Sequence, residues 1–328
     1  MRKVALGGIL GLWLASLASP QDTGDKRELR YKFEKGEKVV LVIKQKMNVK
    51  LDEVPEAFQG IAPEEPFDND FDGTAEFEVK EAGEKGYVLE GRFQTIQAKG
   101  SVIGQDFEFA YDRAKDGDEP KGGGDEGGGG DGGMPGGLGN PADMLRGLAV
   151  ARLKLEIDPL GKFKIGGADG GSGAVATQLL DLGGLIGQLP KDKVGAGDTW
   201  KNSDSLELPG LPFKMRVKSE NKFTKTEKIE GQECALIESK FTVGTEGGDA
   251  DKEEEPPMDL PIPLKAKFTG EGKGSMAFAM DAGRPVKNDM KMDVKLTVTI
   301  SNPQGGDDVE IKGRFKMEQT LGIKKKDY

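Results

Sequence analysis

The fold class follows from residues 290–300, which read Met-Lys-Met-Asp-Val-Lys-Leu-Thr-Val-Thr-Ile. Every second residue is apolar, and the residues between them are charged or threonine. A period of two over this length is typical of a half-buried β-strand and not of a helix. Because parallel sheets are usually covered on both sides, one apolar and one polar face indicate antiparallel pairing.

The same alternation recurs along the chain. It extends over 39–51, where only Gln45 interrupts the apolar side, and over 309–321. Glycine-containing turns such as Gly83–Gly86 separate the runs. Shorter runs occupy 75–79, 87–93, 107–111, 153–157, 213–217, 235–243, 264–268 and 276–280. We therefore expect about ten to twelve strands.

The first residues predict an exported protein. Arg2 and Lys3 precede an uncharged, largely apolar stretch over 4–17, and Ala18 is the natural cleavage point, so 1–18 is interpreted as a signal peptide and 19–27 as a flexible N-terminus. The apolar stretch is shorter than the ~20 residues that cross a bilayer. We expect a periplasmic or extracellular protein of the bacterial envelope with no transmembrane segment.

Composition narrows the possible functions. The 57 acidic and 47 basic residues give a net charge of −10, which argues against a nucleic-acid partner. The chain contains no histidine, the commonest general base and metal ligand. Cys234 is the only cysteine, so no intrachain disulfide is available. Stability must come from a buried core.

Two segments differ from the strands around them. Residues 116–140 are glycine-rich and acidic, and 244–263 are acidic and proline-rich. Such compositions cannot bury enough apolar surface to fold. We interpret both as disordered excursions from a single β-rich domain at 28–323, followed by a basic tail at 324–328. Similar Asp/Gly turns follow the two excursions, so the domain is alternatively interpreted as an internal duplication.

Helical spacing occurs twice. Over 174–189 apolar residues recur at steps of three and four, and Pro190 ends the pattern. A shorter helix is predicted over 141–148, with Asn140 as its N-cap and Pro141 at its first position.

The best metal candidate is Asp68-Asn69-Asp70-Phe71-Asp72-Gly73. Carboxylates of Asp68, Asp70 and Asp72 could converge on calcium, but the twelfth position is Val79 where a calcium loop needs glutamate. An acidic turn entering the strand at Ala75 is the alternative, and the sequence does not decide between them. We assign no catalytic, cofactor or metal residue.

The sequence offers equally weak candidates for a catalytic nucleophile. Ser219 and its neighbour Lys218 would point to opposite faces of a strand. Cys234 is out of phase with the apolar positions beside it, which predicts a solvated or peripherally packed thiol. We expect no enzymatic activity and no cofactor.

Residues 189–200, Leu-Pro-Lys-Asp-Lys-Val-Gly-Ala-Gly-Asp-Thr-Trp, resemble a phrase found in uncharacterised families of exported bacterial β-proteins. The opening Leu29-Arg30-Tyr31-Lys32-Phe33 and the following Gly36 resemble the start of the same proteins. That resemblance implies no activity. The layout is also similar to the lipoprotein-carrier and receptor superfamily, which implies a curved, unclosed sheet around helices or an acyl chain.

We therefore expect a mainly β fold, a large curved antiparallel sheet forming a half-barrel or open barrel with one or two helices on its concave face. A two-sheet sandwich is the alternative. Two functions follow: binding or carriage of a hydrophobic ligand such as a lipid or acyl chain, or a structural or assembly role with envelope proteins as partners and a self-packed core. Methionines on strand interiors suit either. A cavity on the apolar face would separate the two.

Overall fold

The computed structural model describes residues 26–55, 67–102, 105–117, 141–166, 187–207, 214–245, 264–300 and 308–326. These form twelve strands and two helices. In chain order they are β1 (Lys38–Glu53), β2 (Phe67–Gly83), β3 (Gly86–Val102), β4 (Gln105–Asp112), α1 (Arg113–Asp116), α2 (Pro141–Val150), β5 (Leu153–Ile157), β6 (Phe163–Gly166), β7 (Thr199–Glu207), β8 (Lys214–Ile229), β9 (Gln232–Thr245), β10 (Leu264–Ala279), β11 (Arg284–Ile300) and β12 (Val309–Lys325).

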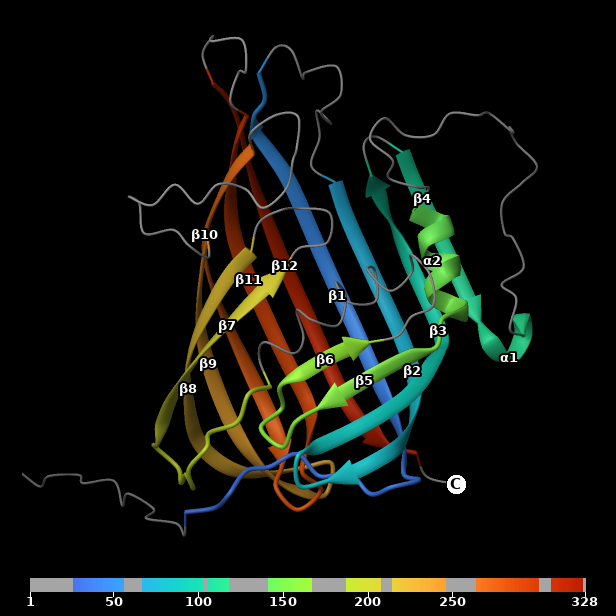
Figure 1. Ribbon diagram of the computed structural model, residues 1–328, viewed down its shortest axis with the longest axis vertical. Helices are drawn as coiled ribbons and strands as arrows, with labels where there is room; N and C mark the ends of the chain where they lie inside the picture. Colours follow the sequence, from blue (N-terminus) through green and yellow to red (C-terminus); the bar gives the residue numbers. More distant parts are fainter. Residues whose placement is uncertain are drawn as a thin grey trace, which may run out of the picture.

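All twelve strands belong to one antiparallel sheet, which curls strongly but does not close into a barrel (Figure 1). Its order is β6-β5-β3-β2-β1-β12-β11-β10-β9-β8-β7, with β4 paired to the far half of β3. The first and last strands are therefore neighbours at the centre, paired from Val39 with Lys325 to Glu53 with Lys312. The predicted mainly β, antiparallel architecture is confirmed.

Glycines on β10 help the sheet to bend. A Cβ at Gly270 would lie 2.6 Å from the carbonyl oxygen of Asp293, and one at Gly272 would lie 2.6 Å from that of Lys291. Glycine in a strand interior marks a bend or a close approach of another backbone. Here it lets β11 lie close against β10. A register shift between Ala277 and Phe278 adds a bulge further along the same strand.

The main core lies on the apolar face of the sheet at one end. Phe93 and Ile96 of β3 are fully buried there, and α2 adds Leu145 and Leu148 to the same cluster. Helix α2 packs on β3 and β4. The short helix predicted over 141–148 is confirmed by α2. The helix predicted over 174–189 falls almost wholly outside the described residues, and its last residues, 187–189, are not helical.

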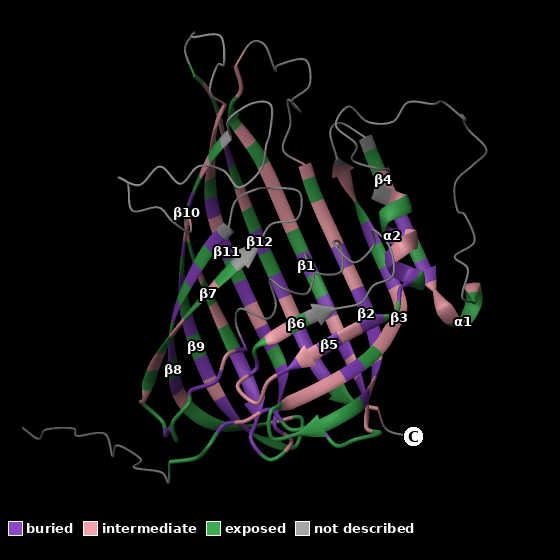
Figure 2. Cartoon of the chain, in the orientation of Figure 1, coloured by how far each residue is buried: buried purple, intermediate pink, exposed green. Residues whose placement is uncertain are grey.

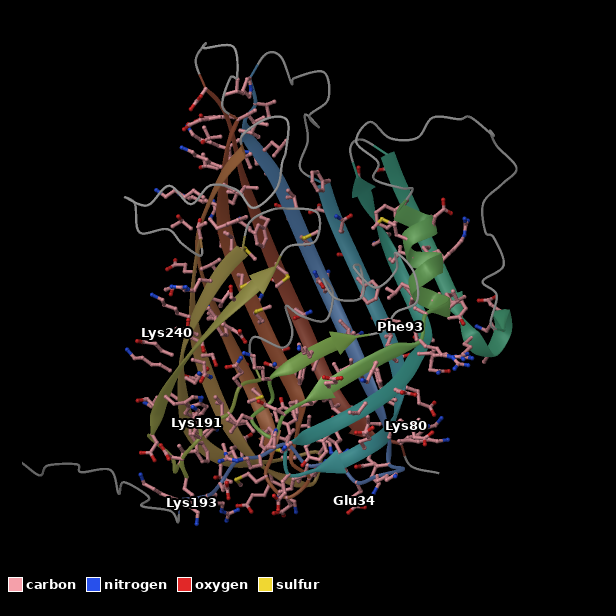
Figure 3. The ribbon with its side chains drawn as sticks, viewed as in Figure 1. Glu34, Lys80, Phe93, Lys191, Lys193 and Lys240 are labelled. Carbon is pink, nitrogen blue, oxygen red and sulfur yellow. The ribbon has the colours of Figure 1, made fainter. Side chains whose placement is uncertain are left out.

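The two phrases noted in the sequence meet at this end of the sheet. Arg27 and Val194 exchange backbone hydrogen bonds of 2.9 Å, and Arg30 donates to the carbonyl of Pro190 at 2.8 Å. Figure 3 shows Glu34, Lys191 and Lys193 at the same end of the molecule. The opening phrase supplies three buried side chains, Leu29, Tyr31 and Phe33. Both phrases thus contribute to packing.

A buried ion pair completes this end. Arg284 Nη2 lies 2.8 Å from Glu37 Oε1, with side-chain exposures of 10% and 5%. The guanidinium also lies 5.5 Å from the ring centre of Phe33. The backbone of Glu37 is fixed to Val79, whose N–H donates to its carbonyl at 2.9 Å. The pair therefore ties the start of β1 to the start of β11.

Several expectations lie outside the described residues. They are the signal peptide at 1–18, most of the N-terminus at 19–27, and nearly all of the two excursions at 116–140 and 244–263. In the segment interpreted as a basic tail, Lys324 and Lys325 are part of β12, and Lys326 lies 2.6 Å from Glu76. No described helix is long and apolar enough to cross a membrane.

Candidate ligand-binding face

The apolar face of the sheet changes character along its strands. Beyond the main core lies a second cluster, which we call the methionine cluster because β8, β11 and β12 each give it methionines. Its exposures are as low as 0% at Val294 and 1% at Met317. Side chains this inaccessible leave no water-sized void beside them, so this part of the face is filled. The cluster consists of Met215, Val217, Phe241, Val243, Phe268, Met290, Met292, Val294 and Met317.

Two pairs of buried polar side chains lie beside the methionine cluster. Gln45 lies opposite Gln319, and Ser239 lies opposite Asn221, all of them buried. Ser239 donates to Asn221 Oδ1 at 2.6 Å, and Gln45 Nε2 lies 3.5 Å from the sulfur of Met317. The single break that Gln45 makes in its strand pattern is therefore matched by Gln319 on the neighbouring strand, and the register places this pair in line with Ser239 and Asn221 across Met290 and Gly274.

Toward the ends of β1, β10, β11 and β12 the same face becomes half-buried (Figure 2). Strand pairing makes this patch continuous: Val298 lies opposite Ile311 on one side and Ala266 on the other, and Val49 lies opposite Phe315. We call the patch the apolar rim. It consists of Met47, Val49, Leu51, Ala266, Leu296, Val298, Ile300, Val309, Ile311 and Phe315.

The apolar rim is a suitable surface for an apolar ligand. Its side chains are aliphatic or aromatic and retain exposed area, which the methionine cluster lacks. Removing such apolar area from water contributes a favourable free energy of about 25 cal/mol per Å². The alternation predicts a candidate binding surface over the whole apolar face. The gradient of burial along the strands could not be read from alternation, because the alternation is equally regular in both zones.

The candidate calcium loop is not a loop. Asp68, Asp70 and Asp72 belong to β2, so their carboxylates project from an extended strand at intervals of about 7 Å. Each meets a different partner: Asn48 Nδ2 lies 2.7 Å from Asp68, Lys99 Nζ lies 3.7 Å from Asp70, and Lys44 Nζ lies 2.8 Å from Asp72. The expectation of an acidic turn before Ala75 is also wrong, since β2 begins at Phe67. Among the described residues no group of three acidic or thiol side chains is placed to hold a metal.

The remaining candidates have structural roles. Cys234 is fully buried in a small separate cluster with Ala277, Ala279 and Val286, so it is peripherally packed and not solvated. Burial raises the pKa of its thiol. Trp200 packs against the main core and donates from Nε1 to the carbonyl of Gln188 at 3.2 Å.

Two depressions are lined largely by charged residues, in contrast to the apolar rim. One of about 1040 Å³ is bordered by β1–β4 and β12 and includes Asp68, Asp70, Lys46 and Lys99. The other, of about 720 Å³, lies over β7–β11 and is rich in lysine. The first depression also reaches Met47 of the apolar rim, whereas the second contains no residue of the rim.

No known family model matches the sequence, and no curated protein matches it either. Among solved structures, the chain is similar to an outer membrane channel from Pseudomonas putida F1, at a TM-score of 0.22 and 5% identity over 90% of this chain and 97% of that one. It is also similar to the outer membrane protein OprG from Pseudomonas aeruginosa, at 0.19 and 6% over 90% and 100%.

A third likeness is to a DUF1329 family protein from Desulfovibrio piger, at a TM-score of 0.14 and 10% identity over 88% of this chain and 84% of that one. Scores this low establish neither a shared fold nor a shared function.

Proposed function

We propose that this chain is an exported, non-catalytic protein of the bacterial envelope that binds a hydrophobic ligand, a lipid or acyl chain, at the apolar rim. The observation that supports this proposal is the contrast between two zones of one face. The methionine cluster is packed to exposures of a few per cent, whereas the rim, built from the same residue types on the same strands, stays half-buried. Ligand binding is thus proposed for the rim and not for the face as a whole.

The size of the rim suits an acyl chain. Each buried methylene contributes about 0.8 kcal/mol, so eight of them would contribute roughly 6 kcal/mol before the costs of association are subtracted. The rim offers side chains from four neighbouring strands, which extend about 14 Å across the sheet at about 4.8 Å per strand. An acyl chain of eight methylenes can lie across these four strands.

Adjacent residues on β11 provide a matched test. Val298 belongs to the rim, whereas Thr297 is equally half-buried but points to the charged face, opposite Lys312. V298D would place a carboxylate under the ligand, and T297D would place one beside lysines. We expect V298D to weaken binding of a fluorescent fatty acid at least about tenfold, equal to about 1.4 kcal/mol, with T297D within twofold of the unchanged protein.

Circular dichroism would show that both variants fold. Equal binding by V298D and the unchanged protein would rule out the rim as the site. Saturable binding that both variants lose equally would indicate a general charge effect and would also contradict the proposal.

The second candidate function is a structural or assembly role, which the filled methionine cluster favours. Native mass spectrometry of protein purified from its own envelope separates the two. Lipid that survives purification supports ligand binding. A bare mass, together with no saturable fatty-acid binding, favours the structural role.

A further inference from the structure

The charged face of the sheet carries one row of ionised side chains that crosses ten strands. Strand pairing places one residue from each strand directly opposite the next. From β7 to β4 the row is Lys201, Glu220, Lys240, Lys273, Lys291, Glu318, Lys46, Asp70, Lys99 and Glu108. Positive and negative charges alternate along this row at every position but one.

Lys273 breaks the alternation. It lies between Lys240 of β9 and Lys291 of β11, so that three lysines stand side by side. A carboxylate at 273 would complete the pattern. Neighbouring strands are about 4.8 Å apart, so the three side chains start within about 10 Å of one another. Like charges directly opposite each other destabilise an antiparallel pair.

Close ion pairs form on both sides of Lys240 and Lys273 but include neither of them. Lys201 lies 2.6 Å from Glu220, and Lys291 lies 2.6 Å from Glu318. Among the described residues, no carboxylate lies within ion-pair distance of Lys240 or Lys273. The acids two residues along the strands from these lysines are Glu238, Glu271, Asp289 and Asp293. Asp289 pairs with Lys287 at 2.7 Å, and Asp293 pairs with Arg314.

The three lysines also border a hollow. They line the depression of about 720 Å³ together with Lys201 and Lys222, against the three acids Glu220, Glu238 and Asp289. Five cations against three anions make this depression positive in a protein of net charge −10. In Figure 3 the side chain of Lys240 projects away from the sheet.

We propose that Lys240, Lys273 and Lys291 form a binding site for a phosphate-bearing group with two or more negative charges. Such a group would take the place of the missing carboxylate by accepting hydrogen bonds from neighbouring ammonium groups. Lysine binds phosphate as a point charge with three donors. The site is separate from the apolar rim and does not depend on the function proposed there. The phosphate could belong to a soluble molecule or to a lipid headgroup.

Charge reversal at two positions in the row tests the proposal. K273E restores the alternation, whereas K46E breaks it between Glu318 and Asp70, with the same change in net charge. Calorimetry at low salt would measure the binding of inorganic tripolyphosphate. Co-sedimentation would measure the binding of vesicles with and without phosphatidylglycerol. We expect K273E to lose affinity at least tenfold and K46E to stay within about twofold.

The melting temperatures should move in opposite directions. K273E should melt a few degrees higher than the unchanged protein, and K46E a few degrees lower, because only the first removes like-charge contacts. Binding of tripolyphosphate assigns a soluble ligand, and binding of anionic vesicles alone assigns a lipid headgroup. No saturable binding of either probe, or equal losses in K273E and K46E, would overturn the proposal.

Discussion

Removing one charge from the buried pair of Glu37 and Arg284 should destabilise the fold strongly. The two side chains are 5% and 10% exposed, so water cannot replace a missing partner, and the guanidinium is held further by the ring of Phe33. E37Q keeps the shape of the side chain but leaves the cation unpaired. Breaking a pair buried to this degree typically costs about 3–5 kcal/mol.

That loss is a large part of the total stability. Folded domains are stable by about 5–15 kcal/mol, so E37Q would remove roughly a third. In a domain of this size each kcal/mol lowers the melting temperature by about 2–4 °C, which gives a decrease on the order of 10 °C. Urea unfolding followed by circular dichroism measures the free energy directly.

A double-mutant cycle tests whether Glu37 and Arg284 stabilise the fold as a pair. R284M alone leaves Glu37 buried without its cation and should cost a similar amount. The double variant E37Q/R284M removes both charges, so its loss should be well below the sum of the single losses. A loss below 1 kcal/mol in E37Q, or strict additivity of the two changes, would refute the pairing as a source of stability.

Three further outcomes follow from the packing, and a fourth follows from the pKa of the Cys234 thiol. G272V should destabilise the protein by about 1–3 kcal/mol in urea unfolding, because its Cβ would meet the carbonyl oxygen of Lys291 at 2.6 Å. F93A should cost about 3–5 kcal/mol in the same assay, since Phe93 is fully buried, and a loss below 1 kcal/mol would contradict its core position. Cys234 should react with a thiol reagent only at the rate of unfolding, and fast labelling of the native protein would disprove its burial. The pKa of the Cys234 thiol is higher in the folded than in the unfolded protein, so its contribution to stability is present below about pH 8.5 and decreases as the pH rises above that value. Comparing the free energy of unfolding at pH 7.5 and pH 9.5 would measure this decrease.

The sequence was sufficient for the class of fold, because a period of two is a local property of each strand. The run at 290–300 lies within β11, and the run at 39–51 lies within β1. The order of the strands in the sheet could not be predicted from the sequence. The pairing of β1 with β12 joins residues far apart in the sequence, and no local pattern encodes it.

The candidate sites show the same limit. Alternation placed apolar side chains on one face but could not distinguish the packed Val294 from the half-buried Val298, four residues along the same strand. The acidic stretch at Asp68 predicts a loop because its composition is that of a turn. Its pairing with β1 overrides that local preference and makes it a strand. The row of ionised side chains, with Lys240, Lys273 and Lys291 side by side, becomes visible only from the register of ten strands.

The central pairing of β1 with β12 also has a consequence for how the chain acquires its fold. Synthesis proceeds from the N-terminus, so β1 has a partner on one side as soon as β2 appears, but its other edge stays unpaired until residues 309–325 have been made. Contacts of such long sequence separation make folding slow. The sheet becomes continuous only when its final strand joins the first, and a nascent chain that stopped short of β12 would present the edge of β1 to aggregation.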